Sequence, residues 1–199
     1  MSDTLQSIKD DLDFMKTLAA GDAPEEARRS GAILLASGTL FGGASLGAFA
    51  VTKGWLPTAA INPIWIGSTL VFLAVLTLNV SKKSRSAGLR DRATGLAWGG
   101  VGGSIFSIFL GMYVVANVLK DGHVFALAPT VVLALYGAAW TVAASMSGRL
   151  WMRVVAIASY VFAVGIGALA SSPVVFLAYA GTLVLLAVLP GVALLSRKG

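Results

Sequence analysis

The chain has 199 residues, of which 57% are hydrophobic and only 12% are charged. Its mean hydropathy of +0.83 lies far above that of a soluble domain, so the composition excludes an ordinary globular protein and predicts an integral membrane protein. The net charge of +6 does not indicate a nucleic-acid partner, because most basic residues fall in loops that we expect to face an anionic leaflet. The absence of cysteine excludes disulfides, thiol catalysis and Cys-ligated metals.

Residues 1–30 precede the first apolar run and are expected to form a cytosolic helix and a linker. Apolar residues recur there at helical spacing, which predicts a short amphipathic helix over residues 3–19. Five Asp in residues 1–22 outnumber Lys9 and Lys16, whereas a helix that binds anionic lipid is rich in Lys and Arg. A protein partner is therefore expected for its apolar stripe, which consists of Leu5, Ile8, Leu12 and Met15.

Residues 31–199 are expected to form the membrane domain. Stretches without Asp, Glu, Lys or Arg alternate there with short charged loops, and a stretch of about 20 apolar residues crosses a bilayer. The last stretch contains SSPVV at residues 171–175, which favours a turn between two spans over one overlong helix. The sequence predicts an all-α polytopic membrane protein with six transmembrane helices in three antiparallel hairpins, at residues 31–51, 58–80, 93–118, 124–145, 150–170 and 174–195.

The basic residues are distributed asymmetrically around these spans. With both termini in the cytoplasm, all but Lys53 and Lys120 of the 15 Lys and Arg residues lie inside, in accord with the positive-inside rule. This predicts a bacterial inner (cytoplasmic) membrane protein. The loop at residues 81–92 faces the same side as the acidic N-terminal helix, and its basic residues are expected to contribute to partner binding: Lys82, Lys83, Arg85, Arg90 and Arg92.

Small residues recur every fourth position along the third predicted span, in the stretch GLAWGGVGGSIFSIFLG. Small side chains let transmembrane helices approach closely, so these residues predict a helix-packing face. Packing between spans of one chain is favoured over a homodimer seam, and a lipid or ligand groove is the third alternative. The predicted packing residues, with their counterparts in spans one and five, are Gly38, Gly42, Gly95, Gly99, Gly103, Ser107, Gly111 and Gly167.

The spans lack the residues that reaction chemistry requires. No Asp, Glu, Lys or Arg lies at membrane depth, where an ion-coupled transporter usually carries one. His123 is the only histidine and falls in a short outer loop, where a solvated turn residue is the favoured interpretation. One histidine without cysteine cannot supply a zinc triad or a haem pair. No catalytic residue, metal site or cofactor is therefore predicted.

Hydroxyl groups are the remaining polar side chains at membrane depth. They are expected to bond to their own helices or to neighbouring helices, as Ser, Thr and Tyr commonly do in membrane bundles. The alternative is a small polar pocket lined by Ser104, Ser107, Tyr136 and Tyr160.

These patterns favour a non-enzymatic membrane protein that anchors, regulates or senses through protein interaction. Its acidic N-terminal helix and the basic loop at residues 81–92 would contact a cytosolic protein or a second copy of the chain. A small transporter or channel for a neutral or lipophilic solute is the alternative. An enzyme acting on a lipid is the least favoured hypothesis, since no catalytic constellation is found.

Overall fold

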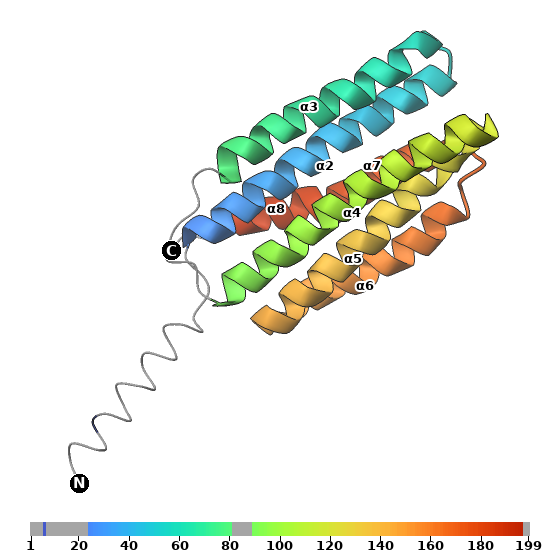
Figure 1. Cartoon of the computed structure of the whole chain (residues 1–199). Helices are drawn as coiled ribbons and strands as arrows, with labels where there is room; N and C mark the ends of the chain where they lie inside the picture. The colour runs from blue at the N-terminus through green and yellow to red at the C-terminus, as the bar shows by residue number, and fades with distance from the viewer. Residues whose placement is uncertain (1–5, 7–23, 81–88, 197–199) are drawn as a thin grey trace.

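The computed structural model describes residue 6, residues 24–80 and residues 89–196, and the described residues are helical without strands (Figure 1). Six helical stretches are long and apolar enough to cross a membrane, which confirms the prediction of an all-α polytopic membrane protein. The predicted N-terminal helix falls outside the described residues, apart from Gln6. The elements are α2 (Pro24–Thr52), η1 (Thr58–Ala60), α3 (Ile61–Val80), α4 (Leu89–Leu119), η2 (Gly122–Leu127), α5 (Ala128–Ser147), α6 (Leu150–Gly167), α7 (Val174–Leu183), η3 (Val184–Val188) and α8 (Leu189–Leu195).

Local sequence explains where the second half of the bundle turns. Helix α5 ends at Gly148, which has the left-handed conformation (φ 66°) and donates its N–H to the Ala144 carbonyl at 2.9 Å. A left-handed residue at this position is the usual glycine C-cap, because a Cβ atom disfavours it. Arg149 is extended, and α6 begins at the next residue. This short turn places α5 and α6 side by side (Figure 1).

The last span is a continuous run of α7, η3 and α8 in which η3 is a π-helical turn. The N–H of Leu189 bonds to the Val184 carbonyl, five residues earlier, instead of four. Pro190 follows directly and has no N–H to offer the preceding turn. A π-turn is a recognised way to accommodate such an interruption within a helix.

Helix α2 lies at the centre of one half of the bundle. It packs against α3 on one side and against α7, η3 and α8 on the other, whereas α4, α5 and α6 pack in sequence order as a second group (Figure 1). The last span barely touches α6, its neighbour in sequence, and instead lies along α2. Span order alone therefore does not determine which helices pack most closely.

Two glycines set the distance between α2 and α8. A Cβ atom on Gly191 would lie 2.8 Å from the Leu35 nitrogen and 2.9 Å from the Gly31 carbonyl oxygen. A Cβ on Gly31 would in turn lie 2.8 Å from the Gly191 carbonyl oxygen. The two backbones are thus in direct contact, and small residues permit this in a bilayer, where apolar side chains gain little by leaving lipid.

Bulky aromatic side chains contribute to the buried core of the bundle. Trp140 of α5 is 1% exposed, and Tyr136 of α5 and Tyr179 of α7 are also buried. The Trp98 ring of α4 meets both Tyr136 and Trp140 edge to face at 5.4 Å between ring centroids, a favourable aromatic geometry. The Tyr136 hydroxyl donates to the Ser37 hydroxyl of α2 over 3.4 Å, which links the two groups.

The α2–α8 contact predicts that Gly191→Ala destabilises the protein by about 1–3 kcal/mol, because the added methyl group meets backbone atoms that cannot turn aside. Gly181→Ala is the matched control in the same span, since nothing lies within 4 Å of its Cβ position. The control should be neutral or slightly stabilising, because Ala is favoured over Gly in a helix by about 0.5–1 kcal/mol. Thermal unfolding in detergent measures both. Equal midpoints for the two variants would contradict the contact.

Candidate functional site

The predicted packing glycines of α2 face the last span. A Cβ on Gly38 would lie 2.7 Å from Val188 Cγ2 and 3.1 Å from the Val188 nitrogen, and one on Gly42 would lie 3.9 Å from the Ala180 carbonyl oxygen. Gly167 lies at the end of α6, where a Cβ would be 3.3 Å from Thr130 Oγ1 of α5. These three glycines therefore stand at helix contacts within the chain.

The glycine ladder of α4 has no neighbour within the described chain. Nothing described lies within 4 Å of a Cβ placed on any of its glycines, and Ser107 is exposed. The described residues therefore do not show the contact between these glycines and another span of the same chain that the sequence had led us to expect. Helix α4 contacts α5 through its opposite side, where Val101 and Met112 are buried, and this leaves the small residues on the outside. The ladder consists of Gly95, Gly99, Gly103, Ser107 and Gly111.

Most of the predicted partner-binding residues lie outside the described residues. This applies to Leu5, Ile8, Leu12, Met15, Lys82, Lys83 and Arg85. Arg90 and Arg92 belong to the first turns of α4, so the basic segment leads directly into the helix that carries the ladder.

The four predicted pocket residues do not converge on one cavity. Tyr136 points its hydroxyl to Ser37 of α2, whereas the Tyr160 ring lies against Gly137, its carbons 2.7–2.9 Å from a Cβ built there. The Tyr160 hydroxyl is 3.4 Å from Thr141 Oγ1 on the α5–α6 side of the bundle. Ser104 and Ser107 are half-buried and exposed, respectively, on α4. A solute path through these four residues has no geometric support.

Most other hydroxyl groups in the spans bond to their own helix. Thr69 donates to the Trp65 carbonyl, Ser159 to the Val155 carbonyl and Thr182 to the Ala178 carbonyl, each at 2.8 Å. Bonds of this kind satisfy a hydroxyl locally and leave no polar group aimed at a ligand.

His123 takes part in a turn. Its backbone N–H donates to Asp121 Oδ1 at 2.8 Å, and this carboxylate caps the short helix η2. Both residues are exposed. No cluster of three metal-binding side chains occurs among residues 24–80 and 89–196.

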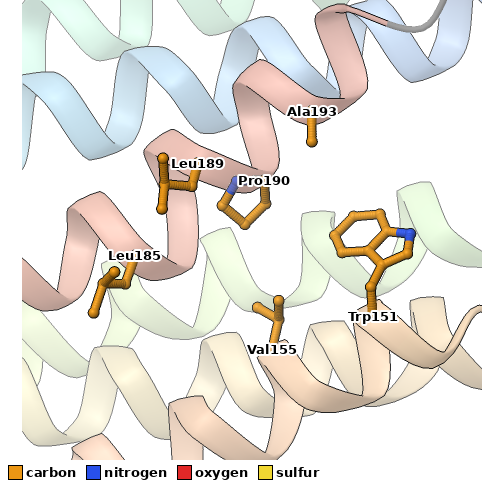
Figure 2. Close-up of a pocket in the computed structure, with 6 residues that line it drawn as sticks. All are labelled: Trp151, Val155, Leu185, Leu189, Pro190 and Ala193. Atoms are coloured by element: carbon orange, nitrogen blue, oxygen red, sulfur yellow. The ribbon is translucent and has the colours of Figure 1, made fainter.

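We describe two grooves on the outside of the part of the bundle formed by residues 24–80 and 89–196. The first, which we call the α6–α8 groove, has a volume of about 370 Å³ and is lined by Trp151, Val155, Leu185, Leu189, Pro190 and Ala193 (Figure 2). The second lies between α2 and the last span, has a volume of about 410 Å³ and is lined by small and aliphatic residues together with Thr39. Neither groove is lined by the four predicted pocket residues.

Sequence reasoning missed three glycines that matter for the architecture. Gly31 and Gly191 form the backbone contact between α2 and α8, and Gly137 receives the Tyr160 ring. Gly191 follows Pro190 in the middle of an apolar run, and this Pro–Gly pair was the sequence feature that could have indicated a close helix contact. Gly31 stands at the edge of the predicted first span, where a helix contact was not anticipated.

Comparison with known proteins gives no assignment: no protein-family model, no curated protein and no solved structure matches the chain significantly.

The filled interior predicts that Trp140→Ala destabilises the protein by about 3–5 kcal/mol, because it removes a large buried ring and leaves a cavity. Trp55→Ala is the matched control, since Trp55 is 73% exposed in the loop between α2 and η1. The control should change stability by at most about 0.5 kcal/mol. Denaturant titration in micelles compares the two, and a tolerated Trp140→Ala would contradict a stabilising role of this ring, which contacts Trp98 of α4 and Trp151 of α6.

Proposed function

We propose that this protein is a non-enzymatic integral membrane protein that acts through protein interaction, as a membrane anchor, regulator or sensor. We place it in a bacterial inner membrane with both termini in the cytoplasm, because this orientation keeps all but Lys53 and Lys120 of the 15 basic residues inside. We further propose that its spans form three antiparallel hairpins preceded by a cytosolic amphipathic helix at residues 3–19.

The observation that carries this proposal is the amount of helix surface without a partner. None of the apolar window of α3 is buried inside the chain, and only 11% of that of α4 is, compared with 50% for the last span. The buried core of the described chain consists of aliphatic side chains together with Tyr136, Trp140 and Tyr179, and much apolar helix surface is turned outward. Outer faces are the part of a membrane bundle that other helices can contact.

A second copy of this chain is the partner that best fits the outer face of α4. A helix pair built on small residues lets two identical faces approach closely around a twofold axis. The basic loop at residues 81–92 leads into α4, so a pair of α4 helices would bring two such loops together. Residues 1–22 of each chain carry five Asp against Lys9 and Lys16, and this acidic segment can neutralise the loop of the other copy.

Co-purification of two differently tagged copies from the same membranes tests the proposal. The unmodified copies should co-purify, whereas Gly103→Leu, which places a bulky side chain on the outer face of α4, should reduce recovery about tenfold, as expected for a loss of about 1.4 kcal/mol. Gly165→Leu is the control, since Gly165 is also exposed with nothing described within 4 Å of its Cβ position.

The same experiment with residues 1–22 removed separates the two predicted partners. Weaker recovery of the second copy indicates that the acidic segment contributes to self-association. Unchanged self-association, with loss of a cytosolic protein identified by mass spectrometry, assigns the segment to that protein. The absence of both effects would contradict a role for the N-terminal segment, and unimpaired co-purification of Gly103→Leu would contradict the α4 interface.

A further inference from the structure

The contacts of the glycines divide the six spans into two helix groups. The first group consists of α2, α3 and the last span (α7, η3 and α8), and the second consists of α4, α5 and α6. Wherever a Cβ built on a glycine of the described chain meets another atom within 4 Å, the nearest atoms belong to the same group. Glycines of α2 meet α3 or the last span, and glycines of α5 and α6 meet each other's helix. In the described chain, close packing at glycines therefore holds each group together and does not join the two.

Contacts between aromatic rings reinforce this division. In the second group, Trp140 of α5 meets Trp98 of α4 with 5.4 Å between ring centroids, and it meets Trp151 of α6 at 5.6 Å. In the first group, Phe41 of α2 meets Phe72 of α3 edge to face at 5.4 Å. Each group therefore has its own set of interlocking rings, which favours its movement as one body.

The two helix groups meet mainly through side chains of the shared core, such as Leu34 of α2 and Leu133 of α5. Their backbones approach each other chiefly where α6 meets α7 and η3. The Tyr136 hydroxyl donates to the Ser37 hydroxyl across the interface over 3.4 Å, longer than the about 2.7–2.8 Å of a typical O–H···O bond. In a bilayer, apolar side chains exchange such neighbours for lipid at little cost, so this interface restrains motion less than the close packing within each group.

The groups are joined at one end of α6 and separated at the other. The turn at residues 168–173 links α6 to α7 (Figure 1), and backbone hydrogen bonds run through it, such as that from the Leu169 N–H to the Ile166 carbonyl at 2.9 Å. The α6–α8 groove lies toward the opposite end. Its walls belong to different groups, with Trp151 near the start of α6 on one side and Ala193 near the end of α8 on the other (Figure 2).

We propose that the two helix groups rock as rigid bodies about the turn between α6 and α7, and that this motion opens and closes the α6–α8 groove. Rigid-body movement of packed helices against each other is a common form of conformational change. The structure, with a groove volume of about 370 Å³, represents the open arrangement. No residue that lines the groove is charged, so closure brings apolar side chains together without burying a charge. This inference goes beyond the proposed function, because it concerns motion within one chain and requires no partner.

Distances between pairs of spin labels on the full chain in lipid nanodiscs test the proposal, because the chain has no cysteine of its own. Leu150→Cys of α6 with Val192→Cys of α8 reports on the end that carries the groove, and Val164→Cys with Val174→Cys reports on the same two spans beside the turn. All four positions are exposed. Labelled chains are mixed with an excess of unlabelled chains, so that distances within one chain are recorded. We expect two distances for the first pair and one narrow distribution for the second.

Two further comparisons tie the motion to the groove. Leu96→Cys of α4 with Leu150→Cys is the matched pair within the second helix group and should give one narrow distribution, since both positions are exposed on the same rigid body. Ala193→Phe fills the groove and should leave only the longer distance of the Leu150–Val192 pair. Val161→Phe, at an exposed position of α6 outside the groove lining, should leave both distances. An unchanged Leu96–Leu150 distance in Ala193→Phe shows that this variant is folded.

Three results would overturn the inference. A Leu150–Val192 distribution as narrow as that of the Leu96–Leu150 pair shows that the two helix groups form one rigid body. Equal broadening of the Val164–Val174 pair excludes the turn as the pivot. Persistence of both distances in Ala193→Phe excludes closure of this groove. Self-association is recorded separately by co-purification, so failure of the rocking motion is distinguishable from failure of the proposed partner.

Discussion

The architecture depends on the backbone contact between Gly31 of α2 and Gly191 of α8. Helices in a bilayer gain little from exchanging lipid for other apolar side chains, so their association requires close packing. Atoms of the two backbones here occupy the space that a Cβ would need. The contact fixes the last span to α2, and aliphatic and aromatic side chains from both helix groups complete the core.

This contact also determines which surfaces remain open. Because α8 follows α2, a groove is left between α8 and α6, and the α4–α5–α6 group meets the other helices mainly through large side chains. Helix α4 uses its bulkier residues for this purpose and leaves its glycines outside. The protein thus has small residues in two different settings. Those of α2 and α8 hold the chain together, and those of α4 are available to another molecule.

The sequence predicted the spans well because their signal is composition. Charges are absent over each span, and the described helices begin and end close to the predicted residues, with SSPVV correctly separating the last two spans. Pairing between helices was less predictable. The four-residue spacing of Gly95, Gly99 and Gly103 shows that one face of the helix carries only small residues. It does not indicate which helix packs against that face, and in the structure the face points outward.

The arrangement of the polar side chains within the spans was the least predictable part of the structure. Tyr136 and Tyr160 were grouped because both lie near the middle of their predicted spans. In the structure they project from their helices in different directions, so their hydroxyls meet different partners, Ser37 and Thr141. Depth follows from the distance along the sequence, whereas rotation depends on which helices pack together. The α6–α8 groove was missed for the same reason, since it arises from the displacement of α8 by the Pro190–Gly191 pair and carries no motif of its own.

The central functional claim is that the outer face of α4 meets a second copy of the chain, and a distance measurement tests it most directly. The chain has no cysteine, so Lys120→Cys, at the exposed end of α4 and outside the ladder, provides a single attachment site for a spin label. In lipid nanodiscs, dipolar coupling between labels on two copies should give a narrow distribution consistent with helix axes about 8–10 Å apart. Absence of coupling between copies, or a broad distribution like that of a label on the lipid-facing side of α3, would contradict the account.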